Sequence, residues 1–144
     1  MALRADLDGL RVRMPGSDAV YLIDQGMKRW IPSPAAYERL FRNWDNIHLD
    51  LHLDLIDSGS DFCDGVALLK CDVAYSPSGA LMQGPLIVLS DSLYQTNPTN
   101  LRWIASPAVM ERYQFDWSKV QQWPSGGRIL YLVEPSLTKE GRPD

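Results

Sequence analysis

The chain has 144 residues, of which 45% are hydrophobic, and its formal net charge is −4. This length and hydrophobic content suffice for one domain with its own core, so we expect a single domain over residues 1–144. The negative charge argues against a nucleic-acid partner or an anionic membrane surface, since both are bound largely by clustered lysine and arginine. No apolar run approaches the roughly 20 residues that cross a bilayer, so no transmembrane segment is expected.

The compartment is predicted from the N-terminal stretch and from the two cysteines. The stretch MALRADLDGLRVRMPG lacks the apolar block of a secretory signal, so the sequence as written predicts a cytoplasmic protein. A mature domain whose signal had been removed would look the same, which leaves secretion open. Cys63 and Cys71 are then either reduced thiols, which suit the missing signal, or the ends of a loop closed by a disulfide.

The first elements along the chain belong to a segment that occurs twice. Residues 21–47 align without a gap with residues 94–120, at an offset of 73. We therefore expect an internal duplication, with copy one at about 16–56 and copy two at about 86–133. The identical positions are Tyr21/Tyr94, Arg29/Arg102, Trp30/Trp103, Ile31/Ile104, Ser33/Ser106, Pro34/Pro107, Ala35/Ala108, Glu38/Glu111, Arg39/Arg112 and Trp44/Trp117.

Each copy predicts a β-hairpin, a short helix and a strand. In copy one, β-prone runs at 20–23 and 28–31 flank a turn, and copy two places a turn of the same length at 97–100. Ser33-Pro34 and Ser106-Pro107 are helix openings, with serine as the N-cap and proline at the first helical position. Each helix is expected to run about two turns, with these side chains facing inward: Tyr37, Leu40, Phe41, Met110 and Tyr113.

The stretch His48–Leu55 reads HLDLHLDL, with a leucine at every second position. This alternation predicts a half-buried strand with its leucines toward the core and its histidines and aspartates on the other face. Neighbours on one strand face stand about 7 Å apart, so a metal site would need Asp50 with His48 or His52, plus ligands from elsewhere. A solvated face of an antiparallel sheet is the simpler interpretation, and we expect no metal and no cofactor.

Three further apolar runs, at 66–69, 86–89 and 129–133, predict central strands, and the polar tail at 135–144 is expected to be frayed. The predicted fold class is therefore α+β and mostly β. It consists of duplicated hairpin, short helix and strand units related by a pseudo-twofold axis.

One family resemblance rests on the repeated pattern itself. Tyr-Leu-Ile, a turn, Lys-Arg-Trp-Ile-Pro-Ser-Pro, an aromatic residue and then Trp-x-x-Ile/Val resembles a module that occurs in tandem in bacterial proteins, often surface or secreted ones. Copy two departs from the pattern, with Leu101 in place of the lysine and no glycine in the turn. The resemblance implies a non-catalytic module and names neither a ligand nor a functional residue.

Four of the five tryptophans occupy matched positions in the two copies, and burial in the core is their simpler role. Two of them follow an arginine on a short hairpin, where an indole can reach a rim. An aromatic plane beside an arginine suits sugar rings, whose apolar faces stack while their hydroxyl groups form hydrogen bonds. The candidate ligand-binding residues, in two quasi-equivalent sites, are Trp30, Trp103, Arg29 and Arg102.

The two arginines also have a simpler role. Arg29 and Arg102 can form ion pairs with the matched Glu38 and Glu111, tying each hairpin to its helix, or pack on a tryptophan face.

The sequence favours a non-enzymatic binding or interaction module, with carbohydrate or another small or surface ligand as partner. Patterns of a nucleophile elbow, a phosphate-binding glycine loop and a zinc-protease helix are all missing, so no catalytic residue is assigned. One alternative is a metal-dependent hydrolase that uses His48, Asp50 and His52. The other is an oligomeric structural or toxin-like protein, with copies of the chain as partners.

Overall fold

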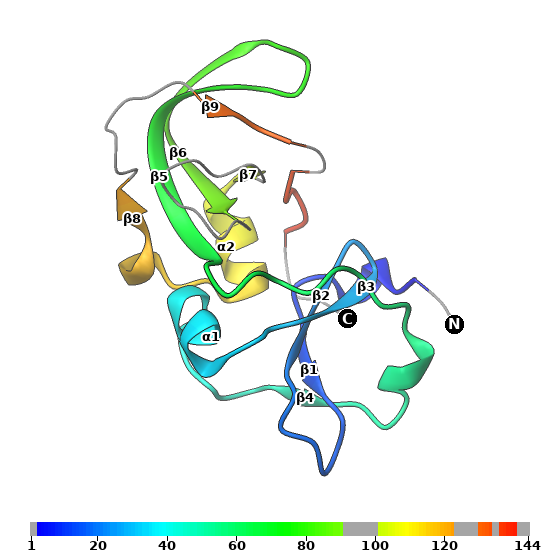
Figure 1. Cartoon of the computed structure of the whole chain (residues 1–144). Coiled ribbons are helices and arrows are strands. Elements are labelled where there is room, and N and C mark those ends of the chain that lie inside the picture. The colour runs from blue at the N-terminus through cyan, green and yellow to red at the C-terminus, as the bar shows by residue number, and fades with distance from the viewer. Residues whose placement is uncertain (1–2, 91–100, 123–129, 134–135, 141–144) are drawn as a thin grey trace.

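The computed structural model describes residues 3–90, 101–122, 130–133 and 136–140 (Figure 1). Within these ranges, the α-helices are α1 (Pro34–Leu40) and α2 (Pro107–Tyr113), and the 3-10 helices are η1 (Ala5–Leu7), η2 (Leu53–Leu55) and η3 (Trp117–Lys119). The strands are β1 (Arg11–Arg13), β2 (Tyr21–Asp24), β3 (Met27–Trp30), β4 (His48–Leu49), β5 (Ala67–Tyr75), β6 (Leu81–Ser90), β7 (Leu101–Ile104), β8 (Gln121–Gln122) and β9 (Leu130–Tyr131). The fold is thus α+β and mostly β, as predicted.

The strands form two sheets with the same topology. The N-terminal sheet has the order β3-β2-β1-β4, and the C-terminal sheet has the order β7-β6-β5-β8, with β9 also pairing with β5. In both sheets the first three strands of that order are antiparallel neighbours, while the fourth is parallel to the third. The helix in each half lies in the connection that leads to this parallel fourth strand (Figure 1). This match of order and direction is consistent with an internal duplication.

Strand register corrects one part of the sequence alignment. Tyr21 pairs with Trp30 and Val88 pairs with Trp103, so Val88 is the structural counterpart of Tyr21. The alignment instead matched Tyr21 with Tyr94, which lies outside the described residues. The offset between the halves is 67 at Tyr21 and 73 at Trp30. Six more residues therefore separate Val88 from Trp103 than separate Tyr21 from Trp30.

The repeated unit also begins earlier than the sequence match. Val12 of β1 pairs with Tyr21 and His48. Leu69 of β5 pairs with their counterparts, Val88 and Gln121, so Val12 and Leu69 occupy equivalent positions. Here the offset is 57, so β1 and β5 could not be aligned with the rest of the repeat without gaps. The unit is a three-stranded antiparallel sheet, a helix and a parallel fourth strand.

The helix caps form as the sequence predicted. Ser33 Oγ accepts a hydrogen bond from the Ala36 amide at 3.1 Å, and Ser106 Oγ accepts one from the Val109 amide at 3.4 Å. Proline follows each cap, where its missing N–H needs no partner. The predicted inward side chains are all buried: Tyr37, Leu40, Phe41, Met110 and Tyr113.

The two halves share one core and meet in a reciprocal contact. Phe41 forms an antiparallel bridge with Phe115, and their rings stack with centroids 5.5 Å apart. The Arg42 amide donates to the Gln114 carbonyl at 3.3 Å. Residues 41 and 42 correspond to 114 and 115, so the residue pairs 41–115 and 42–114 are exchanged when the two halves are exchanged. The shared core around them includes Leu22, Ile31, Leu68, Leu89, Ile104 and Val109.

The strand predicted over HLDLHLDL is wrong beyond its first two residues, which form β4. Asp50 Oδ1 accepts a hydrogen bond from the His52 amide at 2.8 Å, so the aspartate supplies an acceptor to the backbone and turns the chain. A 3-10 helix follows at Leu53–Leu55. Of the four leucines only Leu53 is buried, whereas the exposed fractions of Leu49, Leu51 and Leu55 are 50%, 71% and 55%.

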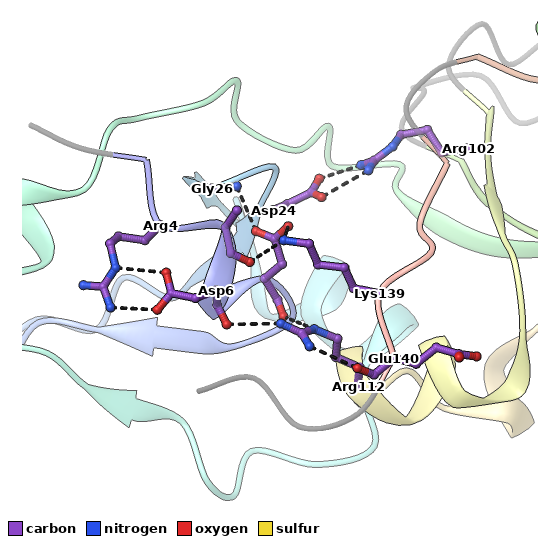
Figure 2. A network of polar contacts seen from close by, with 10 residues as sticks. Arg4, Asp6, Asp24, Gly26, Arg102, Arg112, Lys139 and Glu140 are labelled. Carbon is purple, nitrogen blue, oxygen red and sulfur yellow. Dashed lines mark hydrogen bonds and ion pairs between the residues drawn. The ribbon is translucent and has the colours of Figure 1, made fainter.

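The C-terminal segment 136–140 packs on the rest of the chain, while the other residues of the tail predicted to fray lie outside the described residues. Leu137 is buried, and its amide donates to the Trp103 carbonyl at 2.8 Å. Lys139 Nζ lies 3.1 Å from Asp8 Oδ2, and the Glu140 carbonyl accepts from Arg112 (Figure 2). The Phe62 amide donates to the Trp30 carbonyl at 2.9 Å in the same way, so a later segment covers the outer edge of both β3 and β7.

Cys63 and Cys71 do not form a disulfide with each other in the described part of the chain. Cys63 is half-buried, and Cys71 lies in the core of the C-terminal sheet. Burial raises the pKa of the Cys71 thiol, and the nearby Asp72 carboxylate adds to this effect. Cys71 is therefore a protonated core side chain at neutral pH.

Candidate functional site

Arg29 and Arg102, predicted to bind ligand, are buried and share a single carboxylate. Arg29 NH1 lies 3.0 Å from Asp24 Oδ2. Arg102 holds both oxygens of the same group, at 2.5 Å and 3.1 Å (Figure 2). The guanidinium of Arg29 also lies 3.8 Å from the ring centroid of Phe62. Since Arg102 comes from the other half, this cluster joins the two halves. Both arginines therefore have a structural role and are not candidate ligand-binding residues.

The matched glutamates are not the partners of these arginines. Glu111 forms an exposed ion pair with Arg42 at 2.7 Å, and Glu38 accepts a hydrogen bond from the Trp44 indole at 3.3 Å. The hydrogen bonds and charge of Arg42 lower the pKa of Glu111. The buried acid that serves both arginines is Asp24, which the sequence comparison did not single out.

Each half has a pocket at the junction of its sheet and the start of its helix. The N-terminal pocket has a volume of about 660 Å³ and the C-terminal pocket about 530 Å³. The N-terminal pocket is lined by Arg13, Asp18, Ala19, Val20, Trp30, Ile31, Pro32, Ser33, Pro34, Tyr37, Trp44 and Ile47. The C-terminal pocket is lined by Lys70, Pro85, Leu86, Ile87, Trp103, Ile104, Ala105, Ser106, Pro107, Met110, Trp117 and Val120.

The two linings correspond residue by residue. Arg13 and Lys70 hold the same place, because each pairs with the second residue of the parallel strand β4 or β8. Ser33 and Ser106 are the matched helix caps. Every other residue of the N-terminal lining also has a counterpart in the C-terminal lining. The counterpart lies 67 positions later for the residues just before β2, and 73 positions later for the residues from β3 onward. The pockets are therefore a property of the repeated unit.

Two tryptophans line each pocket, and they are more exposed than a core role requires. The exposed fraction is 38% for Trp30 and 46% for both Trp44 and Trp117, while Trp103 is half-buried. Trp30 and Trp103 were candidates from sequence, whereas Trp44 and Trp117 were expected only to pack in the core. Their polar neighbours in the sequence, Asn-Trp-Asp and Asp-Trp-Ser, were the available signal that these indoles reach solvent. Trp123 lies outside the described residues.

The N-terminal pocket holds Trp44 firmly. Its indole stacks on Tyr37, with centroids 3.9 Å apart and planes inclined by 16°. Tyr37 is itself fixed, since its hydroxyl accepts from Arg11 at 2.6 Å and donates to the Asn43 carbonyl at 2.5 Å. Burial raises the pKa of Tyr37, so its hydroxyl stays protonated. The counterpart of Tyr37 in the C-terminal pocket is Met110, which offers no ring for Trp117 to stack on.

The helix-cap serines complete the polar part of each pocket. While Ser33 Oγ caps α1, its hydroxyl donates to Asp64 Oδ1 at 2.6 Å. Ser106 Oγ donates to Glu140 in the corresponding position. An acid from the segment that covers the sheet edge therefore orients the serine in both halves. Each pocket consequently combines open indole faces with a fixed polar rim.

The histidine-rich stretch does not form a comparable site. His48 is exposed on β4, and the Asp50 carboxylate is used in the turn with the His52 amide. Across the described residues, no three histidine, cysteine, aspartate or glutamate side chains gather in a group that could hold a metal ion. The metal-dependent alternative therefore gains no support from the positions of these three residues.

Comparisons with known proteins leave the geometry as the main guide to function. No family model, curated protein or solved structure matches the chain. In the part of the chain that the structure describes, neither helix has the length and apolar character needed to cross a membrane.

Proposed function

We propose that the chain is a non-enzymatic carbohydrate-binding module with two quasi-equivalent sites, one in each pocket. The observation that carries this proposal is the pair of exposed tryptophans in each matched pocket. Indole has the largest apolar surface of any side chain, so its burial would stabilise the fold. Three of the four rings are nevertheless 38–46% exposed, and that stabilisation is only partly realised. A ligand with flat apolar faces would recover that burial.

Sugar rings suit these pockets for two reasons. Their C–H faces stack on indole, while their hydroxyl groups can pair with polar side chains at the rim. The N-terminal pocket offers Arg13 and Asp18 beside Trp30 and Trp44, which supply both donors and acceptors. Proline-rich peptides also dock on aromatic grooves, but their rings carry no hydroxyl groups for an Arg and Asp pair to recognise.

The site residues proposed here differ from those predicted by sequence. Both sets contain Trp30 and Trp103. The structure-based set has Arg13 and Lys70 as its basic residues, where the sequence-based set had Arg29 and Arg102. It also includes Trp44 and Trp117. The oligomeric or toxin-like alternative gains no specific support from the described residues.

A glycan array followed by tryptophan fluorescence titration of the hits tests the proposal. Trp44→Ala and Trp117→Ala should each weaken binding to their pocket by roughly thirtyfold, since truncating a central aromatic contact costs about 2 kcal/mol. Tyr131→Ala is the matched control, because Tyr131 is 71% exposed and stacks on Tyr75 away from both pockets. No hits and unchanged fluorescence would refute the proposal, and so would proline-rich peptides binding the tryptophans while sugars do not.

A further inference from the structure

The two pockets share their tryptophans and their helix caps but differ in charge. Arg13 in the N-terminal pocket corresponds to Lys70 in the C-terminal pocket, and Asp18 corresponds to Pro85. The N-terminal lining thus has one positive and one negative side chain. Among the described residues, the C-terminal lining has one positive side chain and no acid of its own. The acids that orient the cap serines, Asp64 and Glu140, lie one at each pocket and do not distinguish them.

The two basic side chains also differ in what they contact. Arg13 NH1 donates to the Ser17 carbonyl at 3.3 Å, so the local loop uses part of its guanidinium. Lys70 is held through its backbone, which pairs with Ile87 and Gln122 and also accepts a hydrogen bond from the Gln122 side chain at 3.3 Å. Its ammonium has no hydrogen-bond or ion-pair partner within the described ranges. An exposed ammonium at the rim of an apolar pocket can therefore bind an anionic group of a ligand.

We propose that the C-terminal pocket binds a sugar that carries a carboxylate, such as a uronic acid unit, whereas the N-terminal pocket binds a neutral sugar. This assignment rests on the proposed function and adds the ligand class of each site. The indoles stack on the ring in either pocket, and the Lys70 ammonium donates charge-assisted hydrogen bonds to the carboxylate. In the N-terminal pocket, Asp18 repels such a carboxylate and instead accepts hydrogen bonds from hydroxyl groups.

The test follows the indole N–H signals of the whole chain by heteronuclear NMR, during titration with tetragalacturonate and with the neutral cellotetraose. Single Trp→Phe variants assign the signals. We expect tetragalacturonate to shift the Trp117 signal and cellotetraose to shift the Trp44 signal. High salt should weaken only the tetragalacturonate titration, since counterions screen an exposed charge pair.

Two charge variants separate a specific role for Lys70 from a general effect of charge. Lys70→Gln should weaken tetragalacturonate binding about tenfold, as expected for one charge-assisted hydrogen bond, and leave cellotetraose binding unchanged. Arg13→Gln, which removes the same charge from the other pocket, should leave tetragalacturonate binding unchanged. Asp18→Asn should allow tetragalacturonate to shift the Trp44 signal as well.

The charge assignment is overturned if Lys70→Gln binds tetragalacturonate as the wild type does, or if both sugars shift Trp44 and Trp117 alike, while the proposed carbohydrate function stands. If neither sugar moves any indole signal and the array yields no hits, both proposals fall.

Discussion

The cluster around Asp24 makes the sharpest prediction about stability. Asp24 is 1% exposed and contacts Arg29 from its own half and Arg102 from the other half. Asp24→Asn keeps the size of the side chain but removes the charge that both guanidinium groups share. Removing one partner of a buried ion pair typically costs about 3–5 kcal/mol, because the remaining charge stays in a poorly solvated place. That loss is a large part of the roughly 5–15 kcal/mol that stabilises an ordinary domain.

Urea unfolding followed by tryptophan fluorescence measures this effect. For a dependence on urea of about 2 kcal/mol per molar, the midpoint of Asp24→Asn should fall by roughly 2 M. Arg102→Met should cost less, because it removes the bond between the halves but leaves Asp24 with Arg29. Glu111→Gln is the control, since it removes the exposed ion pair with Arg42 and should barely move the midpoint.

Equal urea midpoints for Asp24→Asn and Glu111→Gln would show that the buried Asp24 cluster stabilises the fold no more than an exposed ion pair does. A double variant of Asp24→Asn with Arg102→Met adds a second check. Because the two residues contact each other, the losses in unfolding free energy of the two single variants should add up to clearly more than the loss in the double variant. Strict additivity would mean that the carboxylate does not act through Arg102.

Three further predictions concern backbone, core and pH. Gly9→Ala should destabilise the fold more than Gly16→Ala in thermal unfolding, because both glycines have φ above +80° but only at Gly9 would the new methyl group lie 2.9 Å from a backbone carbonyl oxygen. Phe41→Ala should cost about 3–5 kcal/mol in urea unfolding, as for other fully buried phenylalanines. Arg42 lowers the pKa of Glu111, so the contribution of this pair to stability is present above the ordinary pKa of 4.5 and is lost as pH falls through the lower folded value. An NMR titration of Glu111 in Arg42→Gln should return its pKa toward 4.5.

Local sequence signals were sufficient for the helices and for the hairpin of the first half. Ser-Pro caps and apolar spacing act within a few residues, so α1 and α2 could be placed from sequence alone. The hairpin of the second half was misaligned because six more residues separate its paired positions. The turn predicted at 97–100 lies outside the described residues. Only the pairing of Val88 with Trp103 identifies the correct counterpart of Tyr21.

Tertiary pairing explains the other two differences. The HLDLHLDL pattern satisfies the strand period, but only His48 and Leu49 pair with β1, and the Asp50 side chain then turns the chain. Sequence likewise could not show that Arg102 crosses to Asp24 of the other half, because the two residues are far apart along the chain. The pockets depend on the same long-range pairing, which brings Arg13 and Lys70 beside the tryptophans.

The matched tryptophans are better explained by the pockets than by the core. A residue kept only for packing should be buried, as Ile31 and Ile104 are at 5% and 4% exposed. Trp44 and Trp117 are matched in the same way, yet both are 46% exposed. Their support differs as well, since Tyr37 under Trp44 is replaced by Met110 in the C-terminal pocket.

An exposed indole that recurs while the matched lining residue changes from Tyr37 to Met110 supports the proposed role for the open face of the ring. The stacked support also predicts an order of affinity. Because Tyr37 fixes Trp44 before any ligand arrives, the N-terminal pocket loses less side-chain freedom on binding. Its preferred sugar should therefore bind more tightly than an uncharged sugar binds beside Trp117. Tyr37→Met, which copies the C-terminal pocket, should remove that advantage.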